Sequence, residues 1–167
     1  MRRAARLPAV PAALTVGVIS DTHGLLRPEA IEALRGSDLI VHAGDVGNAD
    51  VLETLRAIAS TVAVRGNVDT GAWASALPAT EVVEVGGIHL YVLHDISTLD
   101  LDPNAAGFAA VIFGHSHRSS AELRDGVLFL NPGSAGPRRF SLPIGVARLR
   151  VVGGQLSHDL VEFSIPR

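Results

Sequence analysis

Aspartate, asparagine and histidine side chains follow five separate apolar segments of this sequence, and they are the residues best suited to chemistry. They are Asp21 and His23, then Asp45, Asn67 and His94, and finally His115 and His117. Their nitrogen and oxygen donors, with no sulfur among them, are compatible with Mn, Fe, Zn, Co or Ni. These seven donors exceed what one tetrahedral zinc ion needs, and they suit two ions that share a carboxylate. We expect Asp45 to be the shared ligand.

The segments that precede these side chains have the composition of buried strands. They are short runs rich in Val, Ile and Leu at 15–20, 38–42, 61–64, 88–93 and 109–113. The carboxyl ends of strands in an α/β sheet share one edge, so we expect the donors to gather there. Residues two apart in an extended chain point to the same side. Asp21 with His23, and His115 with His117, are therefore each expected to offer two donors to one site.

Helical patterns separate the first three of these strands. One pattern opens at Pro28 and stops at Gly36, and the next is capped by Asn48 or Asp50. Three successive strand, turn and helix units predict a parallel sheet with right-handed crossovers.

Hairpin patterns dominate the rest of the chain. Strands are predicted at 81–85 and 88–93 around Gly86-Gly87, at 122–124 and 127–130, and at 144–152 and 156–163 around Gly153-Gly154. This half is expected to be mainly antiparallel. The sequence therefore predicts two packed sheets with helices outside. We expect one domain over residues 15–167, preceded by a flexible leader over residues 1–14.

Composition excludes several classes of protein. The 167 residues include no Cys, and all 14 basic residues are Arg, which excludes thiolate metal sites, Cys nucleophiles and Lys-dependent chemistry. A net charge of −3 without a long basic block argues against a nucleic-acid partner. No apolar run approaches the roughly 20 residues that cross a bilayer, so we expect a cytoplasmic protein without a membrane partner.

Four motifs, together with Gly44-Asp45 and His94, resemble those of the calcineurin-like metallophosphoesterases, and especially of their small single-domain bacterial and archaeal phosphodiesterases. The motifs are Asp21-Thr22-His23-Gly24, Gly66-Asn67-Val68-Asp69, Gly114-His115-Ser116-His117 and Asn131-Pro132-Gly133-Ser134. The resemblance covers the chain from about Val16 onward. It implies a four-layer α/β/β/α sandwich of two mixed sheets flanked by helices.

The resemblance also implies a division of the ligands between two divalent transition-metal ions. Asp21, His23, Asp45 and His117 would surround one ion, and Asp45, Asn67, His94 and His115 the other. Manganese is the first expectation for the metal, with Fe, Zn, Ni or Co as alternatives. The implied enzyme is a metal-dependent phosphodiesterase that hydrolyses small or nucleotide-derived phosphodiesters through a hydroxide between the metals.

Two positions depart from the larger members of that family. Asn48 stands where they have an acidic residue, and Val68 stands where they have a histidine that aids the leaving group. The absence of that histidine suggests slower catalysis, or substrates with better leaving groups.

Alternatives remain open at the level of function and of single residues. The same fold serves as a non-catalytic protein scaffold in a trafficking coat, and a phosphomonoesterase or phosphoprotein phosphatase is a further alternative. His42, His89 and His158 match no metal position and are expected to be structural, and Asp69 is expected to cap its loop. Arg118 is the expected phosphate contact because it follows His117; Arg65, Arg138 and Arg139 are weaker candidates.

Overall fold

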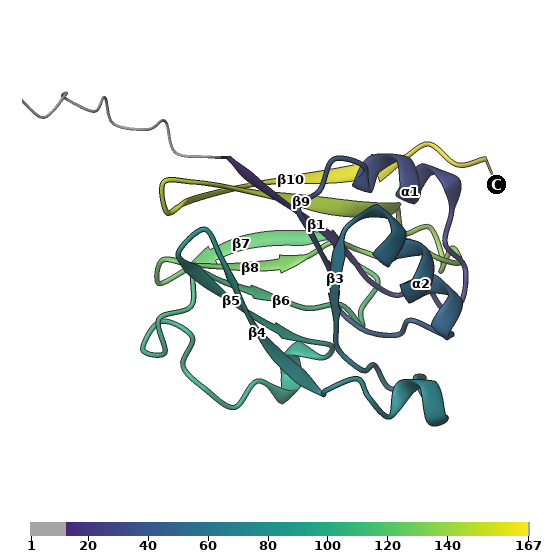
Figure 1. Ribbon diagram of the computed structural model, residues 1–167, viewed down its shortest axis with the longest axis horizontal. Helices are drawn as coiled ribbons and strands as arrows, with labels where there is room; N and C mark the ends of the chain where they lie inside the picture. The colour runs from purple at the N-terminus through teal and green to yellow at the C-terminus, as the bar shows by residue number, and fades with distance from the viewer. Residues whose placement is uncertain (1–12, 167) are drawn as a thin grey trace, which may run out of the picture.

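Two five-stranded sheets pack face to face in the computed structural model of the chain, which describes residues 13–166 (Figure 1). The first sheet has the order β10-β9-β1-β2-β3. Its strands are β1 (Leu14–Ile19), β2 (Leu39–His42), β3 (Ser60–Ala63), β9 (Ile144–Val152) and β10 (Gln155–Phe163). Strands β1, β2 and β3 run parallel, as predicted, and β9 lies antiparallel to β1 and forms a hairpin with β10.

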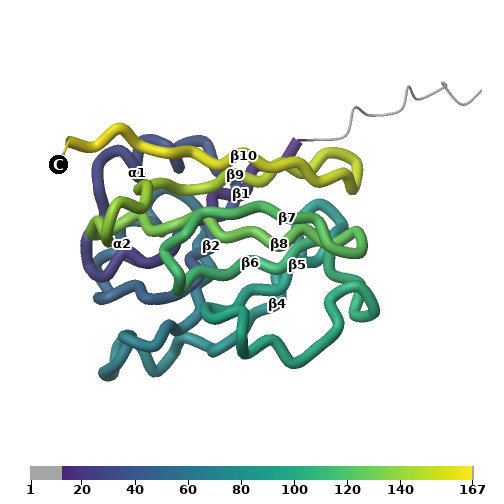
Figure 2. Tube along the Cα trace, turned by 180° about the vertical axis from the view of Figure 1, so that it is seen from behind, coloured from purple at the N-terminus to yellow at the C-terminus, as the bar shows by residue number. Residues whose placement is uncertain are grey.

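The second sheet has the order β4-β5-β6-β8-β7, which can be followed from behind in Figure 2. Its strands are β4 (Thr80–Val85), β5 (Ile88–Leu93), β6 (Ala110–Ile112), β7 (Ser120–Arg124) and β8 (Val127–Asn131). The predicted hairpin of β4 and β5 is present, but β5, β6 and β8 run parallel. This sheet is therefore mixed rather than mainly antiparallel, because the connection after β5 returns to the starting edge before β6 begins.

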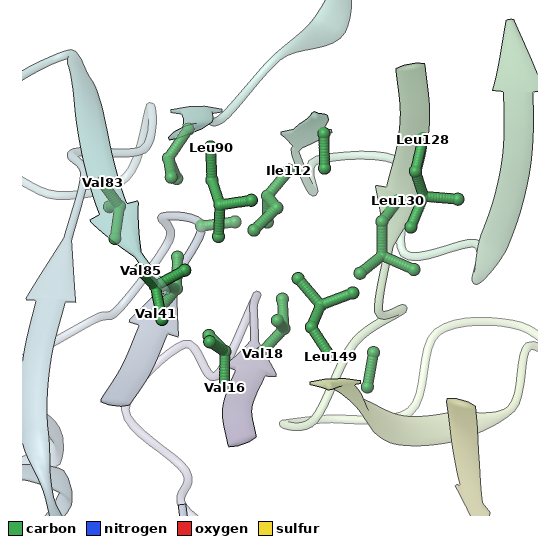
Figure 3. Packing of buried hydrophobic residues seen from close by; sticks show 14 of the residues in the cluster. Val16, Val18, Val41, Val83, Val85, Leu90, Ile112, Leu128, Leu130 and Leu149 are labelled. Carbon is green, nitrogen blue, oxygen red and sulfur yellow. The ribbon is translucent and has the colours of Figure 1, made fainter. Parts of the chain in front are cut away.

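Aliphatic side chains fill the space between the two sheets (Figure 3). Val18 and Leu149 of the first sheet face Leu90, Ile112 and Leu130 of the second, and all five are fully buried. A chain with only 4% aromatic residues builds such a core from close-packed Val, Leu and Ile. This packing fixes the loop-bearing edges of the two sheets relative to each other.

Helices α1 (Pro28–Leu34) and α2 (Ala49–Ile58) cover the outer face of the first sheet. Pro28 occupies the first turn of α1, where its missing N–H costs nothing. The side chain of Asn48 accepts a hydrogen bond from the Val51 N–H (3.2 Å) and so starts α2. Leu52 and Leu55 then point into the layer between helix and sheet.

The outer face of the second sheet is covered by the connection between β5 and β6, which contains the short 3-10 helix η2 (Ile96–Thr98). Leu99 and Phe108 of this connection pack against Tyr91 and Phe129 of the sheet. A second 3-10 helix, η1 (Ala72–Ala74), lies between β3 and β4. The predicted fold class, an α/β sandwich of two mixed sheets, is confirmed.

The predicted leader lies outside the described residues up to residue 12. Leu14, which was assigned to it, is already part of β1 and pairs with Val151 of β9. It does so because its apolar side chain packs against the core between the sheets. Within residues 13–166, no helix is long and apolar enough to cross a membrane.

Candidate metal centre

Six of the seven predicted ligands meet at the carboxyl ends of β1, β2, β5 and β6, in two groups. The first group is Asp21, His23 and His117, and the second is Asp45, His94 and His115. In each group one ligand atom from every residue lies within 4.8 Å of the others. Each group contains three of the four residues that the resemblance assigns to one ion; Asn67 belongs to neither group, and Asp45 belongs only to the second.

The first group points two imidazoles and one carboxylate oxygen at a common point. The Nε2 atoms of His23 and His117 are 3.3 Å apart, and His117 Nε2 is 3.4 Å from Asp21 Oδ1. Among the described residues, Asp21 Oδ1 is buried and has no hydrogen-bond partner. Leaving a buried carboxylate oxygen unsatisfied is costly, so this arrangement fits a divalent ion between the three side chains.

The second group is joined to the first through Asp45. Asp45 Oδ2 lies 3.1 Å from Nε2 of His94 in its own group and 3.6 Å from Nε2 of His23 in the other. His115 completes the second group, with its Nδ1 3.3 Å from Nε2 of His94. One carboxylate oxygen therefore lies within reach of both groups.

Hydrogen bonds hold one side-chain atom of Asp21 and one of His94 and leave the other for a metal. Asp21 Oδ2 accepts from Ser20 Oγ (2.6 Å) and from the His115 N–H (3.1 Å), which leaves Oδ1 for a metal. His94 Nδ1 donates to the carbonyl of Ala43 (2.8 Å), which leaves Nε2 directed at Asp45 and available to a metal. Such outer contacts fix the tautomer and orientation of metal ligands.

Asp45 is held in the same way by the loop after β3. Its Oδ1 accepts a hydrogen bond from the Val68 N–H (3.1 Å), which leaves Oδ2 directed at the two groups. Gly66 allows this loop to lie against Asp45, because a Cβ at that position would collide with Oδ1 and the amide nitrogen of Asp45. The Gly-Asn motif therefore serves to bring backbone close to the shared carboxylate.

Left-handed backbone occurs at five of the six grouped residues. The φ angles are 55° at Asp21, 47° at His23, 54° at Asp45, 73° at His115 and 61° at His117. The extended conformation of the strands thus ends before the ligands. His115 and His117 both lie at this centre, each in a different group, whereas Asp21 and His23 share one group. Each left-handed residue costs about 1–2 kcal/mol, so the loops carry strain at the ligands.

Asp69 ties two ligand loops together and does not take part in either group. Its carboxylate accepts hydrogen bonds from the N–H groups of Val46 (3.1 Å), Gly47 (2.9 Å) and Gly66 (2.8 Å). The expectation that Asp69 caps its loop is confirmed, and it caps the neighbouring loop as well.

His42 is a buried structural residue, as expected. The Gly44 N–H donates to its Nδ1 (3.1 Å), so Nε2 carries the proton and donates to Thr22 Oγ1 (3.0 Å). Thr22 in turn donates to the Val46 carbonyl (2.7 Å). Burial lowers the pKa of His42 to about 4, which keeps the ring neutral. The sequence did not predict the structural role of Thr22 in these hydrogen bonds, because a single hydroxyl side chain in a polar loop is not a distinctive pattern.

Close contact between unlike charges shifts the pKa values at the centre. Burial raises the pKa of Asp45, but the hydrogen bonds from His94 and Val68 outweigh it and bring the pKa to about 2. Burial lowers the pKa of His94, but the hydrogen bonds with Asp45 and Ala43 outweigh it and the pKa rises. The shared carboxylate is therefore anionic over the whole physiological range.

Asn67 and Arg118 lie on the exposed rim of the centre. Asn67 precedes Val68, whose N–H bonds Asp45, and its own side chain is exposed. Arg118 follows His117, is exposed, and has no acidic side chain within ion-pair distance among residues 13–166. Val68, which follows Asn67, is 43% exposed.

The turn at Asn131-Pro132-Gly133-Ser134 forms hydrogen bonds with two of the loops that carry the predicted ligands. Ser134 Oγ donates to the carbonyl of Asp21 (2.9 Å), and Asn131 Nδ2 donates to the carbonyl of Gly114 (3.1 Å). It therefore joins the loop that carries Asp21 to the loop that carries the last two histidines.

Comparison with known families decides what kind of centre this is. The model of the calcineurin-like phosphoesterase superfamily domain matches residues 14–154. The chain belongs to this superfamily. Membership makes it a metal-dependent phosphoesterase by family, and all six grouped residues lie within the matched range.

Two archaeal relatives are named probable metallophosphoesterases. The protein of Methanocaldococcus jannaschii is 35% identical over 134 residues, which cover 72% of this chain and 68% of the relative. The protein of Methanothermobacter thermautotrophicus is 30% identical over 165 residues, which cover 92% of this chain and 95% of the relative. A phosphodiesterase of Methanocaldococcus jannaschii is 26% identical over 138 residues, 72% of this chain and 83% of the relative.

Solved structures share the calcineurin-like phosphoesterase fold over most of the chain. An archaeal phosphodiesterase has a TM-score of 0.74 at 22% identity, covering 89% of this chain and 100% of its own. Vacuolar Protein Sorting 29 from Cryptosporidium parvum has a TM-score of 0.73 at 20% identity, covering 92% of this chain and 99% of its own. At these identities the likeness establishes the fold alone.

Proposed function

We propose that the chain is a phosphodiesterase that uses two divalent metal ions to hydrolyse small or nucleotide-derived phosphodiesters. The observation that carries this proposal is the position of Asp45 Oδ2, 3.1 Å from His94 Nε2 and 3.6 Å from His23 Nε2. A carboxylate oxygen that reaches ligands of both groups suits two ions about 3.5–4 Å apart. Manganese remains our first expectation for the metal.

The residues divide the work of the proposed reaction. Asp21, His23, Asp45 and His117 would hold one ion, and Asp45, Asn67, His94 and His115 the other. Two bound ions would activate water for in-line attack and offset the charge that develops on the phosphoryl oxygens. Arg118, exposed beside His117, would hold a nonbridging phosphate oxygen.

Preference for diesters with good leaving groups follows from Val68. The backbone N–H of Val68 bonds the shared carboxylate, and the residue has an exposed apolar side chain where larger members of the superfamily have a histidine. Without an imidazole to assist departure, an aryl ester should leave far more readily than an alkyl ester. The phosphodiesterase among the relatives supports the diester assignment.

A scaffold without catalysis is the second candidate, and the observation that favours it is the fold shared with Vacuolar Protein Sorting 29. The six clustered donors, with the free Oδ1 of Asp21 among them, support the enzyme.

Metal analysis combined with two substrates tests the proposal. We expect the purified chain to hold up to two transition-metal ions, to hydrolyse bis(p-nitrophenyl) phosphate, to lose activity in chelator and to regain it with manganese. Phosphoserine should be hydrolysed far more slowly. Full activity in excess chelator would refute the metal mechanism, and bound metal without turnover on any diester would support the scaffold. Equal rates on the two substrates would overturn the preference.

A further inference from the structure

The outer edge of β10 is open. In the order of the first sheet β10 comes last, and among the described residues nothing pairs with its outer edge. Its register with β9 runs without a bulge from Gln155 to Phe163, and the strand contains no Pro. Bulges, prolines and charged side chains are the usual devices that keep edge strands from pairing with other chains. This edge has neither a bulge nor a proline, and its charged residues, Asp159 and Glu162, restrict the registers in which it can pair.

We propose that β10 pairs antiparallel with β10 of a second copy of this chain, about a two-fold axis at Leu160. In this register Leu160 of one copy lies opposite Leu160 of the other. His158 of each copy lies opposite Glu162 of the other copy, so this pair forms twice. A ring N–H opposite a carboxylate is a favourable cross-strand pair. An axis at residue 159 would set Asp159 opposite itself, which like charges disfavour, and an axis at residue 161 would set Glu162 opposite Leu160 and lose its pair with His158.

Exposed apolar side chains lie beside β10, and a second copy paired with this strand would bury them. Leu123 of β7 is 71% exposed, and Leu160 is 38% exposed. A cavity of about 510 Å³ lies between the β7–β8 hairpin and β10, with Leu123, Leu128 and Leu156 in its wall. The second copy would continue the first sheet past its edge, so its inward-facing side chains would lie over Leu123.

Sedimentation velocity of the full chain over a range of concentrations tests the pairing. The wild-type chain should reach twice its 17.4 kDa mass. Leu160→Lys should weaken association roughly tenfold or more, because it places two ammonium groups on the axis. Glu162→Lys should have a similar effect, because each new ammonium group would lie opposite a histidine.

A charge exchange then tests the register itself. Adding His158→Glu to Glu162→Lys should restore the dimer. Positions 158 and 162 of one strand are ~13 Å apart, too far for an ion pair within the chain, so the rescue can come only from the second copy. Glu84→Lys, on the edge strand β4 of the other sheet, is the matched control and should leave association unchanged.

Three results would overturn the inference. They are a wild-type chain that stays monomeric at high micromolar concentration, a dimer indifferent to Leu160→Lys and Glu162→Lys, and a charge exchange without rescue. None of the predicted metal ligands lies on β10. Metal-dependent hydrolysis and association can therefore fail or succeed separately.

Discussion

Asp45 and Arg118 differ in what each is placed to do at the metal centre. Asp45 lies between the two groups of ligands, whereas Arg118 lies on the exposed rim. In the proposed mechanism Asp45→Asn would remove negative charge from between two dications, so kcat should fall by several orders of magnitude and metal occupancy should drop. Arg118→Ala would remove the proposed charge-assisted contact with phosphate, worth about 1.5–3 kcal/mol, so it should mainly raise KM with both metals retained.

Steady-state kinetics on an aryl diester and elemental analysis of the same preparations check this contrast. Glu53→Gln on the outer helix α2 removes one exposed charge that belongs to neither ligand group and serves as the control. If Asp45→Asn kept two metals and near-normal turnover, Asp45 would not be the shared ligand.

At the level of the secondary-structure elements, the sequence predicted where ligands would gather but not how. Polar residues after β1, β2, β5 and β6 marked the site, because parallel strands deliver their carboxyl ends to one edge. The residue spacing did not show that His115 and His117 belong to different groups while Asp21 and His23 share one, because all four residues have left-handed backbone and only the arrangement of the loops in space distinguishes the two pairs. The parallel run of β5, β6 and β8 was missed because a long polar connection gives no direction to the strand that follows.

The end of β2 is joined to the loop after β1 through His42, and this link predicts a pH dependence. The folded protein lowers the pKa of His42 from 6.5 to about 4, so between these values the unfolded chain binds more protons. The free energy of unfolding should therefore fall as the pH drops through this window, by up to about 3 kcal/mol from this residue.

Denaturant unfolding of the metal-free protein at a series of pH values measures this effect. His42→Gln removes the titrating group, so the slope between pH 6.5 and about 4 should be smaller in the variant than in the wild type. Asp45 titrates near pH 2 and contributes below this window. Parallel slopes in the two proteins would show that His42 is not held neutral by the fold.

Across the whole molecule, a close-packed aliphatic core positions a strained and highly polar edge. The core between the sheets is fully buried, while the edge combines left-handed residues with two carboxylates and four imidazoles in close contact. Favourable packing elsewhere must offset the cost of holding these groups together. Bound metal would relieve part of the same cost, because an ion in the first group would satisfy Asp21 Oδ1, which is buried and otherwise lacks a partner.

Metal binding should therefore stabilise the fold. A ligand present at one hundred times its Kd adds about 2.7 kcal/mol, so two manganese ions would add about 5 kcal/mol. For a domain of this size that corresponds to a rise in Tm of roughly 10 °C or more.

Scanning calorimetry with manganese and with chelator should show this rise. Calcium should give a much smaller shift, because it prefers all-oxygen sites over imidazoles. His115→Ala removes a ligand from the second group only and should retain part of the increment. Equal Tm values with manganese and with chelator would show that the two groups do not bind the metal.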